Sequence, residues 1–379
     1  MIPVIRPFLG EEEAQAAAET VRSGWVAQGP RVKQFEGAFA ESVQAAHGVA
    51  LSNCTTALHL SLHLLGIGPG DEVIVPSLSF IATANAVRYV GATPVFADVE
   101  PLTANLTAET VEAVITPRTA AVLAVHQCGM PFDVDTLDAL CAKHKVALVQ
   151  DAACAAGSTY KGRPATAGAS VAAWSFHPRK VLTTGEGGML TTDNEEWAAR
   201  ARRLREHGMS VSAADRHSTD RVVLETYDEV GFNYRMTDLQ AAVGLVQLRK
   251  LPEVIARRRE LADRYHKLFT EVDVDDLRAV TDPEYGTTNY QTFWVELPES
   301  YQGSLVDALS GLAARGISAR RGLMASHNEP AYADAPAELP VTERLTQRLV
   351  ALPLFHQMTE DEQDTVVRAL AEVLREGRR

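Results

Sequence analysis

Short apolar runs alternate with segments of helical character between residues 45 and 195. Most of these runs are continuous rather than interrupted by polar residues, a pattern typical of strands that are buried on both faces of a sheet. They lie at residues 49–51, 73–75, 93–96, 120–125, 146–149 and 171–175. Residues 55–65 and 80–89 read as helices that separate the first three runs. The alternation predicts an α/β fold with a mostly parallel sheet flanked by helices.

The sequence changes character after about residue 240. The last predicted helix opens with Thr359 and Glu362, which have the spacing of a capping box. A chain of 379 residues is longer than one hydrophobic core usually supports. We therefore expect a large domain over residues 1–250, including an N-terminal arm, and a smaller α+β domain over residues 251–379. Helices are predicted at residues 237–250, 253–269, 305–315 and 359–375, and a strand at residues 291–297.

Charge and cysteine usage exclude several classes of protein. A net charge of −13 argues against a nucleic-acid-binding surface. The four cysteines form no Cys-x-x-Cys pair, so we expect free thiols and no metal site. No apolar run reaches the roughly 18 residues of a membrane span, and the first residues lack the pattern of a secretory signal. These observations favour a cytoplasmic protein.

Two reactive side chains follow predicted strands. Ligands of open parallel sheets bind at the carboxyl ends of strands, and Asp151 and Lys180 both fall at such ends. An ε-amine is a nucleophile only when it is neutral, so we expect burial or the adjacent Arg179 to lower the pKa of Lys180. The competing amine is Lys161, which lies in an apparent exposed turn at residues 160–164.

These two groups are the ones that pyridoxal 5'-phosphate (PLP) requires, namely an amine that can bond to its aldehyde and a carboxylate that can pair with its pyridinium nitrogen. The sequence therefore predicts a PLP enzyme in which Lys180 and Asp151 are catalytic. As an alternative on local evidence, Asp151 is an ordinary turn or helix-capping residue.

Further candidates lie near the same strand ends. Thr55 and Thr56 open a helix whose free N–H groups suit a phosphate, and Ser175 is a third phosphate contact. Phe80 is placed to stack on the pyridine ring, and Cys154 to face the phenolic oxygen of the cofactor. Each has a structural alternative: a helix cap, a core phenylalanine or a buried thiol.

Seven stretches of the sequence, which occur in the same order as in a known family, extend the interpretation of this chain as a PLP enzyme. They closely resemble the DegT/StrS-type nucleotide-sugar aminotransferases, a fold-type I PLP family, over roughly residues 5–375. The matching stretches are residues 24–36, 53–59, 76–85, 151–157, 175–180, 185–188 and 231–238.

The resemblance implies a role for each matching residue. It makes Lys180 the lysine that bonds to the cofactor and acts as general base, and Asp151 the partner of the pyridinium. Asn233, with Arg235, would reach the phosphate from a second subunit, which implies a homodimer with a shared active site. The resemblance also places Phe80 on the ring and Thr55, Thr56 and Ser175 at the phosphate.

Two positions depart from the family pattern. Cys154 stands where the family often has glutamine, and Ala156 where it often has histidine. A thiol is a weaker hydrogen-bonding group than an amide. Lysine is retained at position 180, whereas the sugar-dehydratase branch of this fold has histidine there. The branch of PLP-dependent dehydratases is therefore disfavoured.

The implied reaction moves an amino group from L-glutamate to a nucleotide-linked keto-deoxysugar by a ping-pong mechanism that interconverts PLP and pyridoxamine phosphate (PMP). A dTDP- or GDP-4-keto-6-deoxyhexose aminated at C4 is favoured, for antibiotic or polysaccharide biosynthesis. A C3-keto-sugar, a cyclitol ketone, a PLP-dependent lyase and a non-catalytic PLP sensor remain alternatives. Candidate substrate contacts, each of which could equally be an ordinary surface or loop residue, are Trp25, Arg31, Arg321 and His327.

Overall fold

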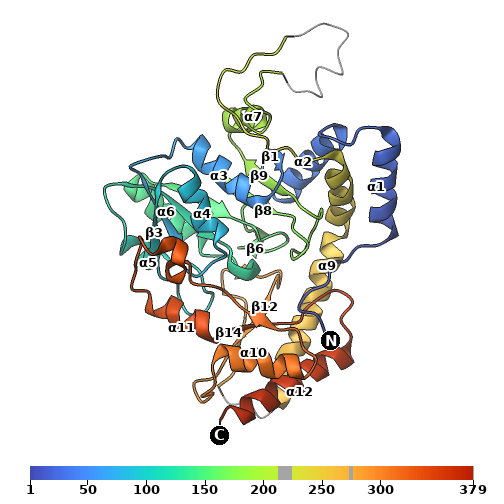
Figure 1. The fold of residues 1–379 in the computed structure, drawn as a ribbon, viewed down its shortest axis with the longest axis vertical. Helices are drawn as coiled ribbons and strands as arrows, with labels where there is room; N and C mark the ends of the chain where they lie inside the picture. The colour runs from blue at the N-terminus through green and yellow to red at the C-terminus, as the bar shows by residue number, and fades with distance from the viewer. Residues whose placement is uncertain (212–223, 273–275, 379) are drawn as a thin grey trace.

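A seven-stranded sheet forms the centre of the fold (Figure 1). The computed structural model describes residues 1–211, 224–272 and 276–378. The strand order is β1-β9-β8-β5-β4-β2-β3, and every neighbouring pair is parallel except the two that involve β9. The predicted mostly parallel α/β sheet is thereby confirmed. Its strands are β1 (His47–Leu51), β2 (Glu72–Pro76), β3 (Thr93–Ala97), β4 (Thr119–Val125), β5 (Ala147–Asp151), β8 (Ala172–Ser175) and β9 (Gly188–Thr192).

Helices cover both faces of this sheet because its strand residues are apolar on both sides. In β2, Val73 and Val75 face one buried cluster, whereas Ile74 faces another. The first face is covered by α3 (Cys54–Leu64), α4 (Ala82–Tyr89) and α7 (Glu195–Leu204). The opposite face is covered by α2 (Pro30–Ser42), α5 (Ala108–Glu112), α6 (Val134–His144) and α9 (Asp238–Glu271).

The C-terminal part contains a separate antiparallel sheet in the order β10-β12-β14-β13. Its strands are β10 (Arg278–Ala279), β12 (Phe293–Glu296), β13 (Arg320–Arg321) and β14 (Leu349–Leu352). Its helices are α10 (Leu305–Ala314), α11 (Pro340–Arg348) and α12 (Glu360–Glu376). The predicted capping box of α12 is present, since the Thr359 hydroxyl accepts a hydrogen bond from the Glu362 N–H.

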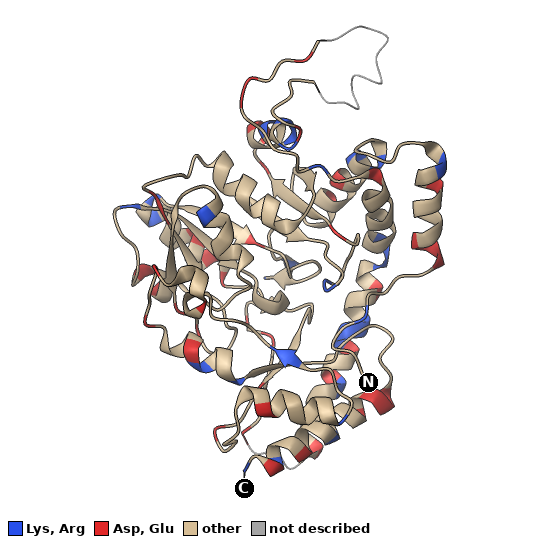
Figure 2. Ribbon diagram, viewed as in Figure 1, with Lys and Arg blue, Asp and Glu red and all other residues tan. Residues whose placement is uncertain are grey.

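Short elements complete the described fold. β6 (Thr159–Tyr160) pairs with β7 (Arg163–Pro164) and with β11 (Gly286–Thr287). Single turns of 3-10 helix are η1 (Gln127–Gly129), η2 (Ser326–Asn328) and η3 (Pro330–Tyr332). Figure 2 shows that charged residues lie mainly on helices and connecting segments, while the central strands are largely uncharged. In the described ranges, no helix is both long and apolar enough to cross a lipid bilayer.

The two helices predicted at residues 237–250 and 253–269 form one continuous helix, α9, so that prediction was wrong. Thr237 is its N-cap, as expected, but Pro252 lies inside the helix and does not end it. An interior proline costs about 3 kcal/mol, and the buried neighbours Leu251 and Val254 hold the helix in place despite that cost. The proposed domain limit at residue 250 falls within α9, and the two-domain division stays a prediction.

α9 connects the part of the molecule that contains the seven-stranded sheet to the part that contains the four-stranded sheet. It packs against α1 (Glu11–Ser23) and α2 near its start and against α12 further along (Figure 1). Midway, the buried guanidinium of Arg258 donates hydrogen bonds to the carbonyls of Tyr290, Gln291 and Leu354. Burial lowers the pKa of Arg258 to about 9. The helix therefore ties the four-stranded sheet to the rest of the chain.

Glu13 fastens α1 to α9. Its carboxylate accepts hydrogen bonds from the Gly10 N–H at 2.8 Å and from Gln247 Nε2 at 2.9 Å, and lies 3.0 Å from Lys250 Nζ. Burial acts to raise the pKa of Glu13, but these contacts outweigh burial and hold the pKa below its ordinary value. A carboxyl with a lowered pKa stabilises the folded state above its unfolded pKa, and the contribution is lost as pH falls through the folded pKa.

We expect Glu13→Gln to lower the melting temperature at about pH 7, with the difference from the wild type shrinking toward about pH 3. Thermal unfolding followed by circular dichroism across this range measures the difference. The control is Glu11→Gln, which removes an exposed carboxylate from the same helical turn. A difference that stays constant with pH would show that the Glu13 charge does not stabilise the fold.

Candidate functional site

Asp151 ends β5 and is 4% exposed. Its carboxylate accepts hydrogen bonds from Thr83 Oγ1 at 2.9 Å and from the Ala153 N–H at 3.1 Å. Burial raises its pKa, while these hydrogen bonds and the charge of Lys180 act in the opposite direction. Within the described part of the chain, Asp151 forms no ion pair at salt-bridge distance. A buried carboxylate without a cationic partner fits a ligand that brings a protonated ring nitrogen.

Lys180 lies between β8 and β9, where the Lys180 N–H donates to the His177 carbonyl. Its side chain is half-buried, and Nζ lies 3.0 Å from Cys154 Sγ. Burial acts to lower the pKa of Lys180, but the nearby Cys154, Cys54 and Asp151 outweigh it and raise the pKa.

The expected lowering of the Lys180 pKa was therefore wrong. The adjacent Arg179, which was expected to contribute to that lowering, is exposed, and the groups that set the pKa of Lys180 are instead Cys154, Cys54 and Asp151. A protonated amine cannot attack an aldehyde, so this proton must leave before Lys180 forms a bond. The rival amine of Lys161 is 57% exposed and pairs with Asp135 at 2.5 Å, so the structure gives Lys161 a surface role.

The first turn of α3 is the candidate phosphate cradle. Asn53 caps the helix: its side chain accepts a hydrogen bond from the Thr56 N–H at 2.9 Å, and the Thr56 hydroxyl donates to the Asn53 carbonyl. Thr55 and Thr56 are half-buried. The capping role of this turn is thus present, and its use for a phosphate stays a prediction.

Gly188 of β9 allows the end of the neighbouring strand β8 to lie close to the first turn of α3. Ser175, half-buried, pairs in register with Gly188 of β9. A Cβ at Gly188 would lie 2.3 Å from the Asn53 carbonyl carbon, a distance that side chains do not reach. Only glycine therefore allows β9 to approach the backbone of Asn53 and Cys54 this closely. The sequence-predicted Ser175 and the start of α3 are joined through this contact.

The segment that carries Asn233 and Arg235 lies along the end of β1. The Ser52 N–H donates to the Tyr234 carbonyl at 2.8 Å, and the backbone of Arg235 forms an isolated antiparallel β-bridge with that of Leu51. Asn233 is exposed and Arg235 half-buried. Both thus lie next to the residues that lead into α3 of the same chain, and their contact with a second subunit stays a prediction.

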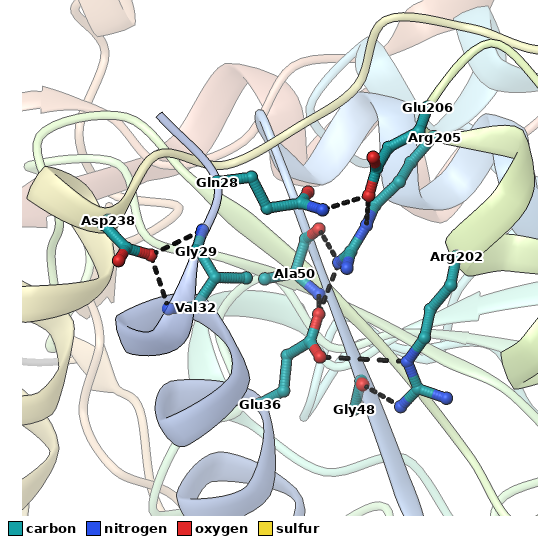
Figure 3. A network of polar contacts seen from close by, with 10 residues as sticks. All are labelled: Gln28, Gly29, Val32, Glu36, Gly48, Ala50, Arg202, Arg205, Glu206 and Asp238. Carbon is teal, nitrogen blue, oxygen red and sulfur yellow. Dashed lines mark hydrogen bonds and ion pairs between the residues drawn. The ribbon is translucent and has the colours of Figure 1, made fainter. Parts of the chain in front are cut away.

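A buried network that the sequence did not predict holds this region together (Figure 3). Arg205 pairs with Glu36 of α2, and each of the two side chains is less than 10% exposed. Arg205 also donates to the Ala50 carbonyl at 2.8 Å, and Glu36 accepts from the Ala50 N–H at 2.9 Å. The Tyr234 N–H donates to the Arg205 carbonyl. The ion pair thus fixes the end of β1 and the segment that carries Asn233.

Asp238 caps α2 from the start of α9. Its carboxylate accepts hydrogen bonds from the Gly29 N–H and the Val32 N–H, each at 2.9 Å (Figure 3). Residue 238 ends the last of the matching stretches, and this cap is a structural use for it. The cap fixes the segment at residues 25–29 that leads into α2 and contains the candidate substrate contact Trp25.

We expect Glu36→Ala to lower the free energy of unfolding by about 3–5 kcal/mol, because it removes the carboxylate that is hydrogen-bonded to the buried Arg205 and leaves only that of Glu206, 3.9 Å from Arg205 Nε. Urea denaturation measures this change. The control is Glu41→Ala, which removes an exposed carboxylate from the same helix and should change stability by less than about 0.5 kcal/mol. Equal, small effects in both variants would mean that the ion pair contributes nothing.

The remaining candidates lie in different places. Phe80 is 64% exposed in the loop after β2. Arg31 is exposed on α2. Trp25, 40% exposed, borders a cavity of about 1110 Å³ beside Arg202 and Met209, away from Lys180.

His327 and Arg321 differ in how they lie relative to Lys180. His327 is buried, and its Nδ1 lies 2.6 Å from Ser77 Oγ at the end of β2. Arg321 borders a cavity of about 200 Å³ that Lys180 also lines. Of the two, only Arg321 shares this cavity with Lys180.

One residue of the site, Thr83, was missed in the sequence. Thr83 Oγ1 donates a hydrogen bond to the Asp151 carboxylate. Ser79, four residues earlier in the chain, places its Oγ 3.0 Å from Thr83 Oγ1. A hydroxyl in the first turn of the helix predicted at residues 80–89 was the available signal. Arg320, next to Arg321, also borders the Lys180 cavity.

The chain matches the DegT/DnrJ/EryC1/StrS aminotransferase family model over residues 7–371. Aminotransferase TlmJ from Streptoalloteichus hindustanus is 38% identical with a TM-score of 0.90, covering 99% of each chain. The PMP form of putative sugar aminotransferase Spr1654 from Streptococcus pneumoniae is 28% identical with a TM-score of 0.92, covering 99% of this chain and 100% of that chain.

DesI, solved in the presence of its TDP-sugar product, is 33% identical with a TM-score of 0.89, covering 100% of this chain and 94% of that chain. A PLP form of Spr1654 matches equally well in fold, with a TM-score of 0.91. The buried carboxylate of Asp151 and the amine of Lys180 fit the same cofactor. The chain therefore belongs to the DegT/DnrJ/EryC1/StrS aminotransferase family and is a PLP-dependent sugar aminotransferase.

Proposed function

We propose that this enzyme transfers the amino group of L-glutamate to a nucleotide-linked keto-deoxysugar, at C4 of a dTDP- or GDP-4-keto-6-deoxyhexose. The observation that carries the proposal is a buried carboxylate, Asp151, whose pKa is affected by the charge of the nearby Lys180 amine, which itself borders a cavity. The TDP-sugar product of DesI supports a nucleotide-linked substrate.

Bound PLP supplies an electron-withdrawing ring that stabilises negative charge on the reacting carbon. Asp151 keeps the ring nitrogen protonated, and Thr83 and the Ala153 N–H hold the carboxylate in place. Lys180 carries the proton to and from the reacting carbon as general base and acid. The Lys180 amine donates a hydrogen bond to Cys154 Sγ at 3.0 Å, and this contact orients the amine.

The same proposal covers the assembly and setting of the enzyme. Thr55, Thr56 and Ser175 would hold the phosphate of bound PLP, Phe80 would stack on its ring, and Asn233 and Arg235 would reach the phosphate from the partner subunit of a homodimer. The exposure of Asn233 and Phe80 in a single chain supports this assembly. A cytoplasmic role in deoxyaminosugar biosynthesis, for an antibiotic or a polysaccharide, follows from the substrate class.

A substrate panel tests the proposal. The PMP-loaded enzyme is incubated with dTDP- and GDP-linked 4-keto- and 3-keto-6-deoxyhexoses and with a cyclitol ketone, and aminated products are detected by mass spectrometry. Amination of a 4-keto substrate alone is the expected result. Amination of only the 3-keto-sugar or the cyclitol ketone would overturn the assigned position or substrate class, and failure with all of them would overturn the substrate assignment.

A further inference from the structure

The cavity beside Lys180 is formed by segments from both sheets. Cys154 and Lys180, in the segments that follow β5 and β8 of the large sheet, border it on one side, and β12, β13 and β14 of the small sheet border it on the other. Asp151, Thr55 and Ser175, the residues expected at the ring nitrogen and phosphate of PLP, do not line it. A ligand in this cavity would therefore lie next to the lysine amine without occupying those cofactor contacts.

Positive charge dominates the wall of this cavity. The arginines on it are Arg179, Arg258, Arg320 and Arg321, and none of the described lining residues is an aspartate or glutamate. Arg258 is buried and bonded to carbonyls, so it contributes a fixed charge. Arg179, Arg320 and Arg321 are exposed, and within the described ranges none of the three forms an ion pair. This local positive charge contrasts with the net charge of −13 of the whole chain.

The size and charge of the cavity indicate its ligand. At about 200 Å³ it is smaller than the roughly 300–1,000 Å³ of pockets that enclose drug-sized ligands. A whole nucleotide-linked sugar, which is at least drug-sized, is therefore too large for this cavity, whereas a short dicarboxylate is small enough to enter it. Planar guanidinium groups bind carboxylates through paired hydrogen bonds. Successive side chains of a strand normally point to opposite faces. Arg320 and Arg321 are the two residues of the short strand β13, and both nevertheless border the cavity.

We infer that Arg179, Arg320 and Arg321 bind the two carboxylates of a dicarboxylic amino donor next to Lys180. The inference rests on the proposed function, because it assigns the site of the donor half-reaction. It makes the enzyme selective for a five-carbon dicarboxylic amino acid over a neutral one such as L-alanine. The same guanidinium groups could instead receive the diphosphate of the nucleotide-sugar, since both ligands present two anionic groups.

Equilibrium binding to the PLP-loaded enzyme separates these sources. Glutarate is the dicarboxylate probe, butyrate the monocarboxylate control and dTDP the diphosphate probe; none carries an amino group, so none reacts. We expect the double variant Arg320→Gln/Arg321→Gln and the single variant Arg179→Gln to weaken glutarate binding at least 10-fold in isothermal titration calorimetry. Butyrate, which offers one carboxylate, should lose less affinity than glutarate, and dTDP binding should change less than about 2-fold. Arg22→Gln, at an exposed arginine of α1, is the matched charge control.

Weakened dTDP binding with unchanged glutarate binding would overturn the inference in favour of a diphosphate site. Unchanged binding of all probes, or an equal loss in Arg22→Gln, would also overturn it. Circular dichroism of each variant shows whether it is folded, and the amplitude of the PLP absorbance band shows whether it retains cofactor. The proposed function fails separately, if the wild-type enzyme binds glutarate through these arginines but aminates no nucleotide keto-sugar.

Discussion

Lys180→Ala is expected to abolish transamination while the protein stays folded. Loss of the proton-transferring group alone should reduce the rate on the order of 10²- to 10⁴-fold. Loss of the covalent bond to the cofactor should add to this and remove the visible absorbance band of lysine-bound PLP. The described hydrogen bond of Lys180 Nζ is with the Cys154 thiol, so truncation breaks no ion pair at salt-bridge distance among the described residues. Steady-state kinetics with L-glutamate and an absorbance spectrum measure both effects.

The surface pair of Lys161 and Asp135 supplies the matched control. Lys161→Ala removes the competing amine and its exposed ion pair, so its rate and spectrum should equal those of the wild type. Near-normal turnover in Lys180→Ala, with inactivity in Lys161→Ala, would show that the other lysine carries the cofactor.

Asp151→Asn is the second change with a large expected effect. The amide keeps the size of the side chain and an acceptor for the Ala153 N–H, but it cannot hold a ring nitrogen in its protonated form. Removing a preorganised electrostatic group of this kind costs about 10²- to 10³-fold in kcat. We therefore expect the rate constant for conversion of bound PLP by L-glutamate to fall by that factor while PLP stays bound. Single-turnover kinetics measures this rate constant.

Stability of the cofactor-free protein gives an independent readout for the same variant. Because burial raises the pKa of Asp151, the folded state binds its proton more tightly than the unfolded state does. Stability then falls as pH rises from the unfolded pKa through the folded pKa. Asp151→Asn removes this penalty, so its melting temperature without PLP should equal or exceed that of the wild type at neutral pH. A marked loss of stability would show that the carboxylate serves the fold. Asp135→Asn is the surface control.

The strands of the large sheet could be predicted because their apolar runs are continuous. β9 was missed because its five residues, Gly188–Thr192, follow a glycine-rich turn and end in two threonines. Its position between β1 and β8 depends on pairing with residues more than 100 positions away in β1, which no local pattern encodes. α9 was divided in the prediction because proline normally ends a helix, and only tertiary packing overrides that preference.

The chemistry of the site could be predicted further than its surroundings. Asp151 and Lys180 follow strands whose carboxyl ends meet at one edge of the sheet, so their proximity follows from topology. The pairing of Glu36 with Arg205 joins positions 169 apart in the sequence and had no signal in either segment. The direction of the Lys180 pKa was wrong because the thiols beside the amine, Cys154 and Cys54, come together only in the fold.

The continuity of α9 sets a rule for tolerated changes in chain length. A helix of 34 residues is about 50 Å long, and each added residue turns everything beyond it by about 100°. One inserted residue between Lys250 and Arg258 would swing the guanidinium away from the three carbonyls it bonds while the Glu13 anchor stays in place. Length variation among natural or engineered versions of this enzyme should therefore avoid this stretch, or occur there only in steps close to whole helical turns.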